Sequence, residues 1–106
     1  MTSEIENFHK VIKSTAKPVF AMVSATWCNP CKIIKPEFMG KSETEKDKAT
    51  FILIDADESQ ELCMHYEITA IPTIMVFKNS DTDVLERFSG SNLDSFNKFV
   101  NKHLAN

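Results

Sequence analysis

Residues 24–38 read SATWCNPCKIIKPEF, and the fold of the chain follows from this stretch. A nearly continuous apolar run, VFAMVSA at 19–25, leads into it and has the length of a strand that is covered on both faces. Two cysteines, Cys28 and Cys31, come next, and the apolar residues after them recur at helical spacing. The sequence therefore predicts a strand that passes directly into a helix, with a cysteine pair at the junction.

The other apolar patterns predict a single α/β domain over residues 1–106. Strands alternate with helices and a hairpin closes the series, which indicates a mixed central sheet of four or five strands with helices on both faces. The strand at 50–56 is expected to be buried. Helices are predicted at 3–14, from Cys28 to Gly40 or slightly beyond with a kink at Pro36, at 59–66 and at 92–103, and strands at 19–25, 50–56, 73–78 and 84–89.

Composition and charge limit the classes of function. The 106 residues include 15 acidic and 12 basic side chains, giving a net charge of -3, and the lysines are scattered rather than gathered in a stripe. We therefore expect no nucleic-acid or membrane partner. The first ten residues are polar and acidic, unlike a secretory signal, and three cysteines is an odd number for a disulfide framework. A cytoplasmic protein that acts as a monomer is expected.

The spacing of the cysteine pair suits thiol chemistry. A thiol at the start of a helix faces unpaired backbone N–H groups and the positive end of the helix dipole, and both favour the thiolate. Cys28 is therefore the expected nucleophile, and Cys31, one turn deeper, can resolve a mixed disulfide. Pro30 is tolerated in the first helical turn, and Trp27 would add an apolar wall beside the pair.

A structural disulfide and a zinc site are the two other interpretations of the cysteine pair, and both are less favoured. A structural disulfide across two residues would remove little entropy from the unfolded chain and would stabilise the fold only weakly. A zinc site needs four ligands, whereas the chain offers one CxxC pair, Cys63 and three dispersed histidines, so no metal is expected. A reactive dithiol is the preferred hypothesis.

Three stretches resemble the thioredoxin family in content and order: SATWCNPCKIIKPEF at 24–38, ITAIPTIMVFKN at 68–79 and FSGSNLDSFNKFVNKHL at 88–104. The resemblance covers nearly the whole chain and implies a thioredoxin fold and a protein-disulfide reductase. It also implies that no cofactor is bound and that electrons come from a thioredoxin reductase using NADPH. The implied partners are this reductase and disulfide-containing proteins.

The resemblance further implies a docking surface for substrates. Pro72 falls where the family has a cis-proline facing the two cysteines, whereas the sequence alone indicates only a turn or an extended segment there. A cis bond would expose the backbone of Ile71, which could then pair with an extended substrate segment. The implied active-site neighbours are Trp27, Asn29, Pro30 and Pro72, and the implied substrate-binding residues are Trp27, Ala70, Ile71, Pro72, Gly90 and Ser91.

Two residues depart from the family pattern. Asn29 stands where a glycine is usual, and its side-chain amide could donate to the Cys28 thiolate and make the protein more oxidising. Met22 stands where the family buries an aspartate, so a costly buried carboxyl group is removed, and with it the general base that would activate Cys31. Because few residues precede the cysteine pair, the family's first edge strand is expected to be shortened or missing.

A thiol-disulfide oxidoreductase of the thioredoxin type is thus the leading functional hypothesis. One alternative within the same chemistry is a glutathione-linked protein, similar to glutaredoxin or to a disulfide isomerase. Another alternative is a binding module of thioredoxin type. Such a module would dock partners through the surface around Trp27 and Ile71, and the redox state of the cysteines would only switch the docking.

Several other residues are expected to be structural. Cys63 has the helical spacing of a small buried residue and is expected to be inert core. Asp55 and Asp57 follow a predicted strand and fit a solvated turn. The histidines lie far apart in the sequence, and each is expected to be exposed or half-buried: His9, His65 and His103.

Overall fold

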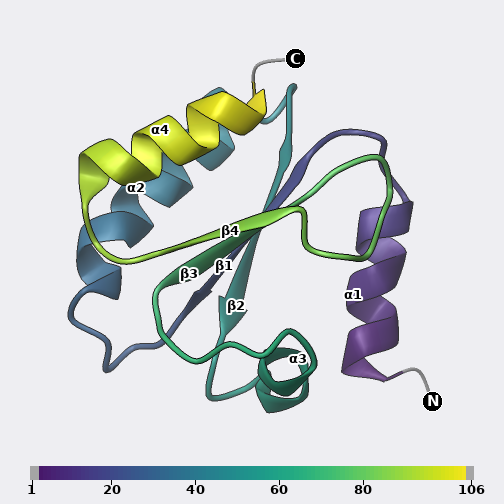
Figure 1. Ribbon diagram of the computed structural model, residues 1–106, viewed down its shortest axis with the longest axis horizontal. Coiled ribbons are helices and arrows are strands. Elements are labelled where there is room, and N and C mark those ends of the chain that lie inside the picture. Colours follow the sequence, from purple (N-terminus) through teal and green to yellow (C-terminus); the bar gives the residue numbers. More distant parts are fainter. Residues whose placement is uncertain (1–2, 105–106) are drawn as a thin grey trace.

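The computed structural model describes residues 3–104, and its helices and strands follow the predicted order (Figure 1). The helices are α1 (Glu4–Lys13), α2 (Cys31–Thr44), α3 (Gln60–His65) and α4 (Leu93–Leu104). The strands are β1 (Val19–Ser24), β2 (Thr50–Asp55), β3 (Thr73–Phe77) and β4 (Glu86–Ser89). They form one mixed sheet in the order β2-β1-β3-β4, in which β1 runs parallel to β2 and β3 runs antiparallel to both β1 and β4.

The central strand β1 is covered by helices on both faces. All six of its residues are buried. Side chains alternate along the strand, so Phe20 and Met22 pack in the apolar cluster under α2 and α4, whereas Ala21 and Val23 pack in the cluster under α1 and α3. Figure 1 shows these two pairs of helices on opposite sides of the sheet. The prediction of a central strand that is covered on both faces is confirmed.

The prediction that the strand at 50–56 is buried is wrong. β2 lies at an edge of the sheet, where Ile54 is its one buried residue and Leu53 is 40% exposed. An apolar run of strand length does not reveal whether the strand has one neighbour or two. Within residues 3–104 no strand precedes β1, and β2 is therefore left at the edge.

The start of α1 and the extent of α2 can be traced to individual residues. The hydroxyl of Ser3 accepts a hydrogen bond from the backbone N–H of Glu6 at 3.0 Å and caps the start of α1. α2 contains Pro36 and continues past Gly40 to Thr44. Pro36 lies inside the helix and does not end it. α2 therefore runs as one element from Cys31, the second cysteine of the pair, to Thr44.

One histidine is more buried than the sequence indicates. His103 is buried in the last turn of α4, where its ring packs against Phe99 and its Nε2 lies 2.7 Å from a carboxylate oxygen of Glu86 on β4. Glu86 satisfies one ring nitrogen and so lowers the cost of burial, whereas Nδ1 is buried without a hydrogen-bond partner among the described residues. His9 and His65 are half-buried and exposed, as expected, but the fold brings their ring centroids to 5.4 Å from each other.

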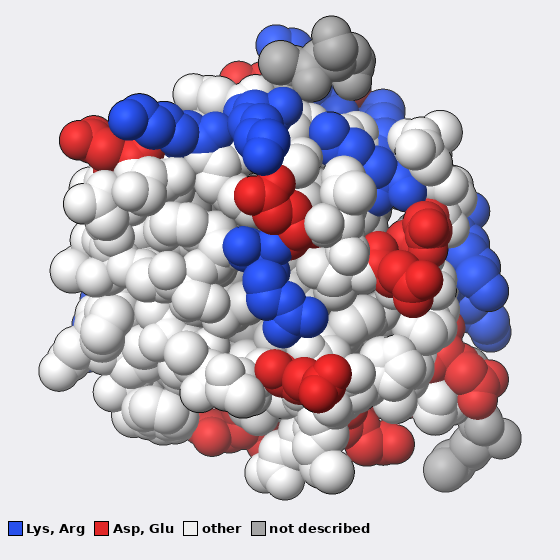
Figure 2. Space-filling model, in the orientation of Figure 1, with Lys and Arg blue, Asp and Glu red and all other residues white. Residues whose placement is uncertain are grey.

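Charged side chains are spread over the surface rather than gathered by sign. Figure 2 shows acidic and basic residues side by side in the upper and right-hand parts of one face, whereas the middle of its left side carries no charge. One such pair is Lys102, which donates to the carboxylate of Glu86 at 3.1 Å. In the part of the chain that the structure describes, no helix has the length and apolar character needed to cross a membrane.

Tyr66, directly after α3, ties that helix to the loop between β3 and β4. Its hydroxyl donates to the carbonyl oxygen of Thr82 at 3.0 Å and lies 3.0 Å from Nε2 of His9. Burial, reinforced by the negative charge of Asp83, raises the pKa of Tyr66 from 10.0 to about 12. The folded protein therefore keeps this proton at a pH where the unfolded chain has released it.

We predict that the free energy of unfolding falls as the pH rises from about 10 toward about 12, because the unfolded chain then binds fewer protons than the folded chain. Urea denaturation over this pH range measures the slope. Tyr66→Phe should lose about 1 kcal/mol at neutral pH through its missing hydrogen bonds, and its alkaline slope should be flatter. Equal slopes in the two proteins would contradict this role of Tyr66.

Candidate redox site

The two cysteines lie beyond the carboxyl end of β1, where the chain turns into α2. The backbone N–H of Cys28 donates to the carbonyl oxygen of Ala25 at 3.1 Å, which closes the turn after the strand. α2 begins at Cys31, and the backbone N–H of Cys31 donates to Sγ of Cys28 at 3.2 Å. A backbone donor at the N-terminus of the helix is thus directed at the first sulfur atom.

A disulfide joins Cys28 to Cys31, whose Cα atoms are 5.3 Å apart. Both residues are buried, with 4% and 2% of their surfaces exposed. The prediction that Cys28 lies in the first helical turn is wrong by three residues, because Pro30 is the N-cap of α2 and the chain needs Asn29 and Pro30 to turn from the strand into the helix. The first sulfur therefore faces the end of the helix from outside.

The segment before β3 forms the wall opposite the cysteines. The peptide bond between Ile71 and Pro72 is cis, and the carbonyl oxygen of Ile71 lies 3.8 Å from Sγ of Cys28. The carbonyl oxygen of Pro72 accepts a hydrogen bond from the backbone N–H of Gly90 at 3.3 Å. The connection between β4 and α4 is thereby attached to the segment that faces the sulfur atoms.

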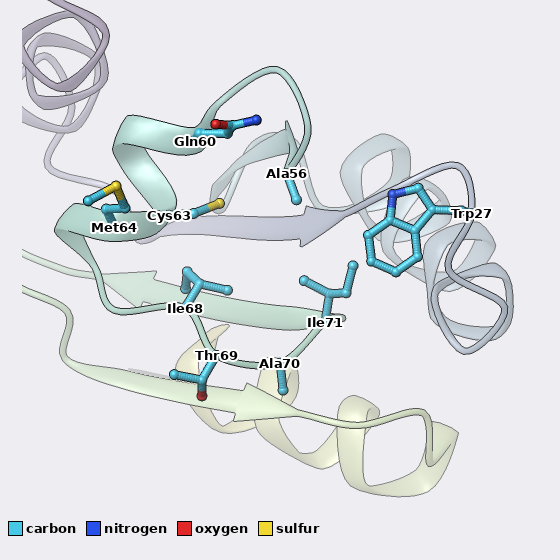
Figure 3. Close-up of a pocket in the computed structure, with 9 residues that line it drawn as sticks. All are labelled: Trp27, Ala56, Gln60, Cys63, Met64, Ile68, Thr69, Ala70 and Ile71. Atoms are coloured by element: carbon cyan, nitrogen blue, oxygen red, sulfur yellow. The ribbon is translucent and has the colours of Figure 1, made fainter.

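A groove of about 400 Å³ runs from Trp27 to α3, and we call it the apolar groove. Trp27 forms one end of the groove (Figure 3), and 64% of its surface is exposed. Its indole N–H donates to the carboxylate of Asp57 at 2.9 Å. No charged side chain lines the groove. The lining residues are Trp27, Ala56, Gln60, Cys63, Met64, Ile68, Thr69, Ala70 and Ile71.

The residues implied for substrate binding fall in two places. Pro72 is buried, Gly90 is exposed and hydrogen-bonded to its carbonyl group, and Ser91 is half-buried; none of the three lines the apolar groove. The groove itself is lined by the other three: Trp27, Ala70 and Ile71.

Sequence reasoning missed part of the groove. The carboxylate of Asp55 accepts from the backbone N–H of Asp57 at 2.8 Å, which confirms the predicted turn, but Asp57 also anchors Trp27. Cys63 is half-buried and lines the groove instead of lying in the core, because α3 is too short for its periodicity to separate the two faces. Burial, followed by the negative charge of Glu4, raises the pKa of the Cys63 thiol.

Met22 lies fully buried in the apolar cluster that also contains both paired cysteines. The buried polar side chains of residues 3–104 are Ser24, Thr73 and His103, so this part of the chain buries no carboxylate. Among the described residues, no three His, Cys, Asp or Glu side chains lie close enough together to bind one metal ion. No buried carboxylate within residues 3–104 is therefore available as a base for Cys31.

A family model described as thioredoxin matches residues 1–102. The chain belongs to the thioredoxin family. The thioredoxin of Ophiophagus hannah is 35% identical over 84% of this chain and 82% of its own length, and that of Oryctolagus cuniculus is 34% identical over 98% of this chain and 100% of its own. Among solved structures, Malassezia sympodialis thioredoxin is 31% identical, with coverage of 99% of this chain and 91% of that chain and a TM-score of 0.85.

Family membership confirms the fold and the class of chemistry that the sequence indicates. The mixed four-stranded sheet with helices on both faces is the thioredoxin fold. With its cysteine pair joined as a disulfide, the chain is a thiol-disulfide oxidoreductase of the thioredoxin type. Its relatives also include thioredoxins named as chloroplastic, from Arabidopsis thaliana, and mitochondrial, from Mus musculus, so the family as a whole occupies several compartments.

We predict that Met22→Asp lowers the free energy of unfolding by about 3 kcal/mol, because it buries a carboxyl group that has no partner in the apolar cluster. The same variant should resolve mixed disulfides faster, by up to about 100-fold, at pH values where the new carboxylate is ionised and can act as a general base for Cys31. Urea denaturation and rapid mixing of a preformed mixed disulfide measure the two effects.

Met22→Leu is the matched control, since it changes the shape of the side chain without adding an acid and should leave the pH profile unaltered. A resolution rate that is identical for Met22→Asp and the unmodified protein at every pH would refute the role assigned to this position.

Proposed function

We propose that the chain reduces disulfides in proteins, with Cys28 as the nucleophile and Cys31 as the resolving thiol. The observation that carries this proposal is the position of the Cys28 sulfur, which accepts the N–H of Cys31 at 3.2 Å on one side and faces the Ile71 carbonyl oxygen at 3.8 Å on the other. Cys31 is the first residue of α2 and is 2% exposed, against 4% for Cys28. This order of the two sulfurs is the one that sequential exchange requires.

Two exchange steps transfer two electrons to the substrate. The Cys28 thiolate attacks one sulfur of the substrate disulfide, forms a mixed disulfide and releases the other substrate sulfur as a thiolate. Cys31, once deprotonated, then attacks Sγ of Cys28, and the second substrate sulfur leaves with its bonding electrons. The chain ends as the Cys28–Cys31 disulfide, the state that the structure describes.

Substrate docking is proposed for the surface beside the cysteines. An extended segment of the substrate would pair with the exposed backbone of Ile71 and place apolar side chains in the groove. The uncharged lining and the large exposed ring of Trp27 support an apolar contact. In this proposal the full set of docking residues is Trp27, Ala70, Ile71, Pro72, Gly90 and Ser91, with Asn29 and Pro30 beside the reacting sulfurs.

Electrons are proposed to come from a thioredoxin reductase that uses NADPH, and no cofactor is proposed to be bound to the chain itself. Residues 1–106 are proposed to form one domain that acts as a monomer in the cytoplasm. Family membership supports a reductase and disulfide proteins as partners in general terms. A glutathione-linked activity is the second candidate. Comparing NADPH consumption with thioredoxin reductase against that with glutathione and glutathione reductase, on the same disulfide substrate, distinguishes the two donors.

We predict that Cys28→Ser abolishes reduction of insulin in the presence of NADPH and a thioredoxin reductase, whereas Cys31→Ser accumulates mixed disulfides that a reductant releases. Cys63→Ser is the matched control for the loss of a thiol and should still reduce insulin without accumulating mixed disulfides, because Cys63 lies outside the pair. Activity that survives Cys28→Ser would refute the proposal. Partners that bind Cys31→Ser only non-covalently would favour a binding module instead.

A second prediction concerns Asn29, which is exposed and makes no side-chain hydrogen bond with residues 3–104 in the disulfide state. If its amide donates to the Cys28 thiolate after reduction, the reduced state is stabilised and the unmodified protein is more oxidising than Asn29→Gly, by about 20 mV for a bond worth about 1 kcal/mol. Equilibration of both proteins with glutathione buffers measures the difference. Identical midpoints would exclude such a bond.

A further inference from the structure

The start of α3 is capped by a side chain from another helix. Ser59 is the N-cap residue of α3, but its side chain makes no capping hydrogen bond. The backbone N–H of Leu62 instead donates to Oε1 of Glu4, in the first turn of α1, at 2.9 Å. A carboxylate at this place satisfies an N–H that has no partner within the helix and meets the favourable end of the helix dipole.

The cap matters for the apolar groove because α3 forms one of its walls. Gln60, Cys63 and Met64 of α3 line the groove (Figure 3), while Leu62 is buried in the cluster under α1 and α3. A helix of six residues is not stable by itself, so its position depends on tertiary contacts. The contact between Glu4 and the Leu62 amide attaches the start of this helix to α1.

Glu4 also influences the thiol that faces the groove. Burial has the larger effect in raising the pKa of Cys63, and the negative charge of Glu4 adds to it. No other ionisable side chain lines the groove, and the chain's two other cysteines are joined to each other. Both effects disfavour the thiolate of Cys63, which is the nucleophilic form, within the surface proposed to receive disulfide substrates.

An ionised Cys63 would compete with the productive reaction. Its thiolate could attack a docked disulfide, form a bond to one substrate sulfur and release the other as a thiolate. The resulting adduct would fill the groove. Cys63 is the one cysteine outside the Cys28–Cys31 pair, so resolution of this adduct would need a thiol of that pair or of a second molecule.

We propose that Glu4 is a positioning residue for substrate docking: its carboxylate caps the start of α3 and fixes this helix, with Cys63 on it, as a wall of the apolar groove. The docking part of this proposal rests on the proposed function. The capping of α3 and the effect of the Glu4 charge on the Cys63 thiol are properties of the folded chain, and they are measured without any substrate.

Three variants separate the two roles. Glu4→Gln keeps an oxygen that can accept from the Leu62 amide but removes the charge, whereas Glu4→Ala removes both. Glu6→Gln is the matched control, because Glu6 lies in the same turn of α1, is exposed and makes no side-chain contact with α3. Hydrogen exchange of the Leu62 amide reports the cap. Alkylation of the oxidised protein by iodoacetamide, between about pH 7 and 9, reports Cys63, which is its one free thiol.

We expect Glu4→Gln to speed the alkylation of Cys63 roughly threefold at a given pH and to leave exchange of the Leu62 amide unchanged. Glu4→Ala should speed the alkylation similarly and also speed the exchange, roughly fivefold. Glu6→Gln should change neither rate. Normal exchange in Glu4→Ala, or alkylation of Glu4→Gln at the rate of Glu6→Gln, would overturn the proposal.

Insulin reduction then tests the consequence for docking. Glu4→Ala should raise KM about threefold with kcat unchanged, and mass spectrometry should find a substrate adduct on Cys63 that Glu4→Ala/Cys63→Ala lacks. An unchanged KM together with faster exchange would overturn the docking role. Failure of the proposed function is recognised separately, because the unmodified protein would then not reduce insulin while the exchange and alkylation rates still differed among the variants.

Discussion

Burial of β1 on both faces is the constraint on which the position of the reacting sulfur atoms depends. The five apolar side chains of this strand pack in one or the other of two apolar clusters, so a slip by one residue would exchange the two faces and disrupt both clusters. Val23 lies opposite Thr73 in the pairing with β3. Cys28 follows Val23 by five residues, and Ile71 precedes Thr73 by two. The register of β1 against β3 therefore brings these two flanking segments together, with the Cys28 sulfur 3.8 Å from the Ile71 carbonyl oxygen.

The parts of the fold that the sequence predicts are those specified by near neighbours in the chain. The apolar run at 19–25 and the helical pattern after the cysteines act over a few residues, and the structure agrees with both except that the helix begins at Cys31 rather than at Cys28. The other errors concern partners that are distant in the sequence. Leu53 is exposed because β2 lacks a second neighbour, His103 is buried because Glu86 meets it from β4, and Cys63 faces a groove whose other wall begins at Trp27.

The site is built largely from backbone groups in apolar surroundings. The polar atoms closest to the Cys28 sulfur are the amide of Cys31 and the carbonyl oxygen of Ile71, and both are held by secondary structure or by its immediate flanks. With Met22 in place of a buried acid, the core around the sulfurs carries no desolvation penalty from a charge. At position 22, greater stability of the fold and a buried base for proton transfer are therefore alternatives.

Ala56 and Ile71 pack against both apolar clusters and also line the groove. A change at either position affects folding on both sides of the sheet and partner recognition together, so few substitutions satisfy all three demands. Gln60 and Met64, on the outer wall, are exposed and belong to neither cluster. In a lineage of such proteins, partner preference can diversify at these outer positions while the residues nearest the sulfur atoms stay restricted by the fold itself.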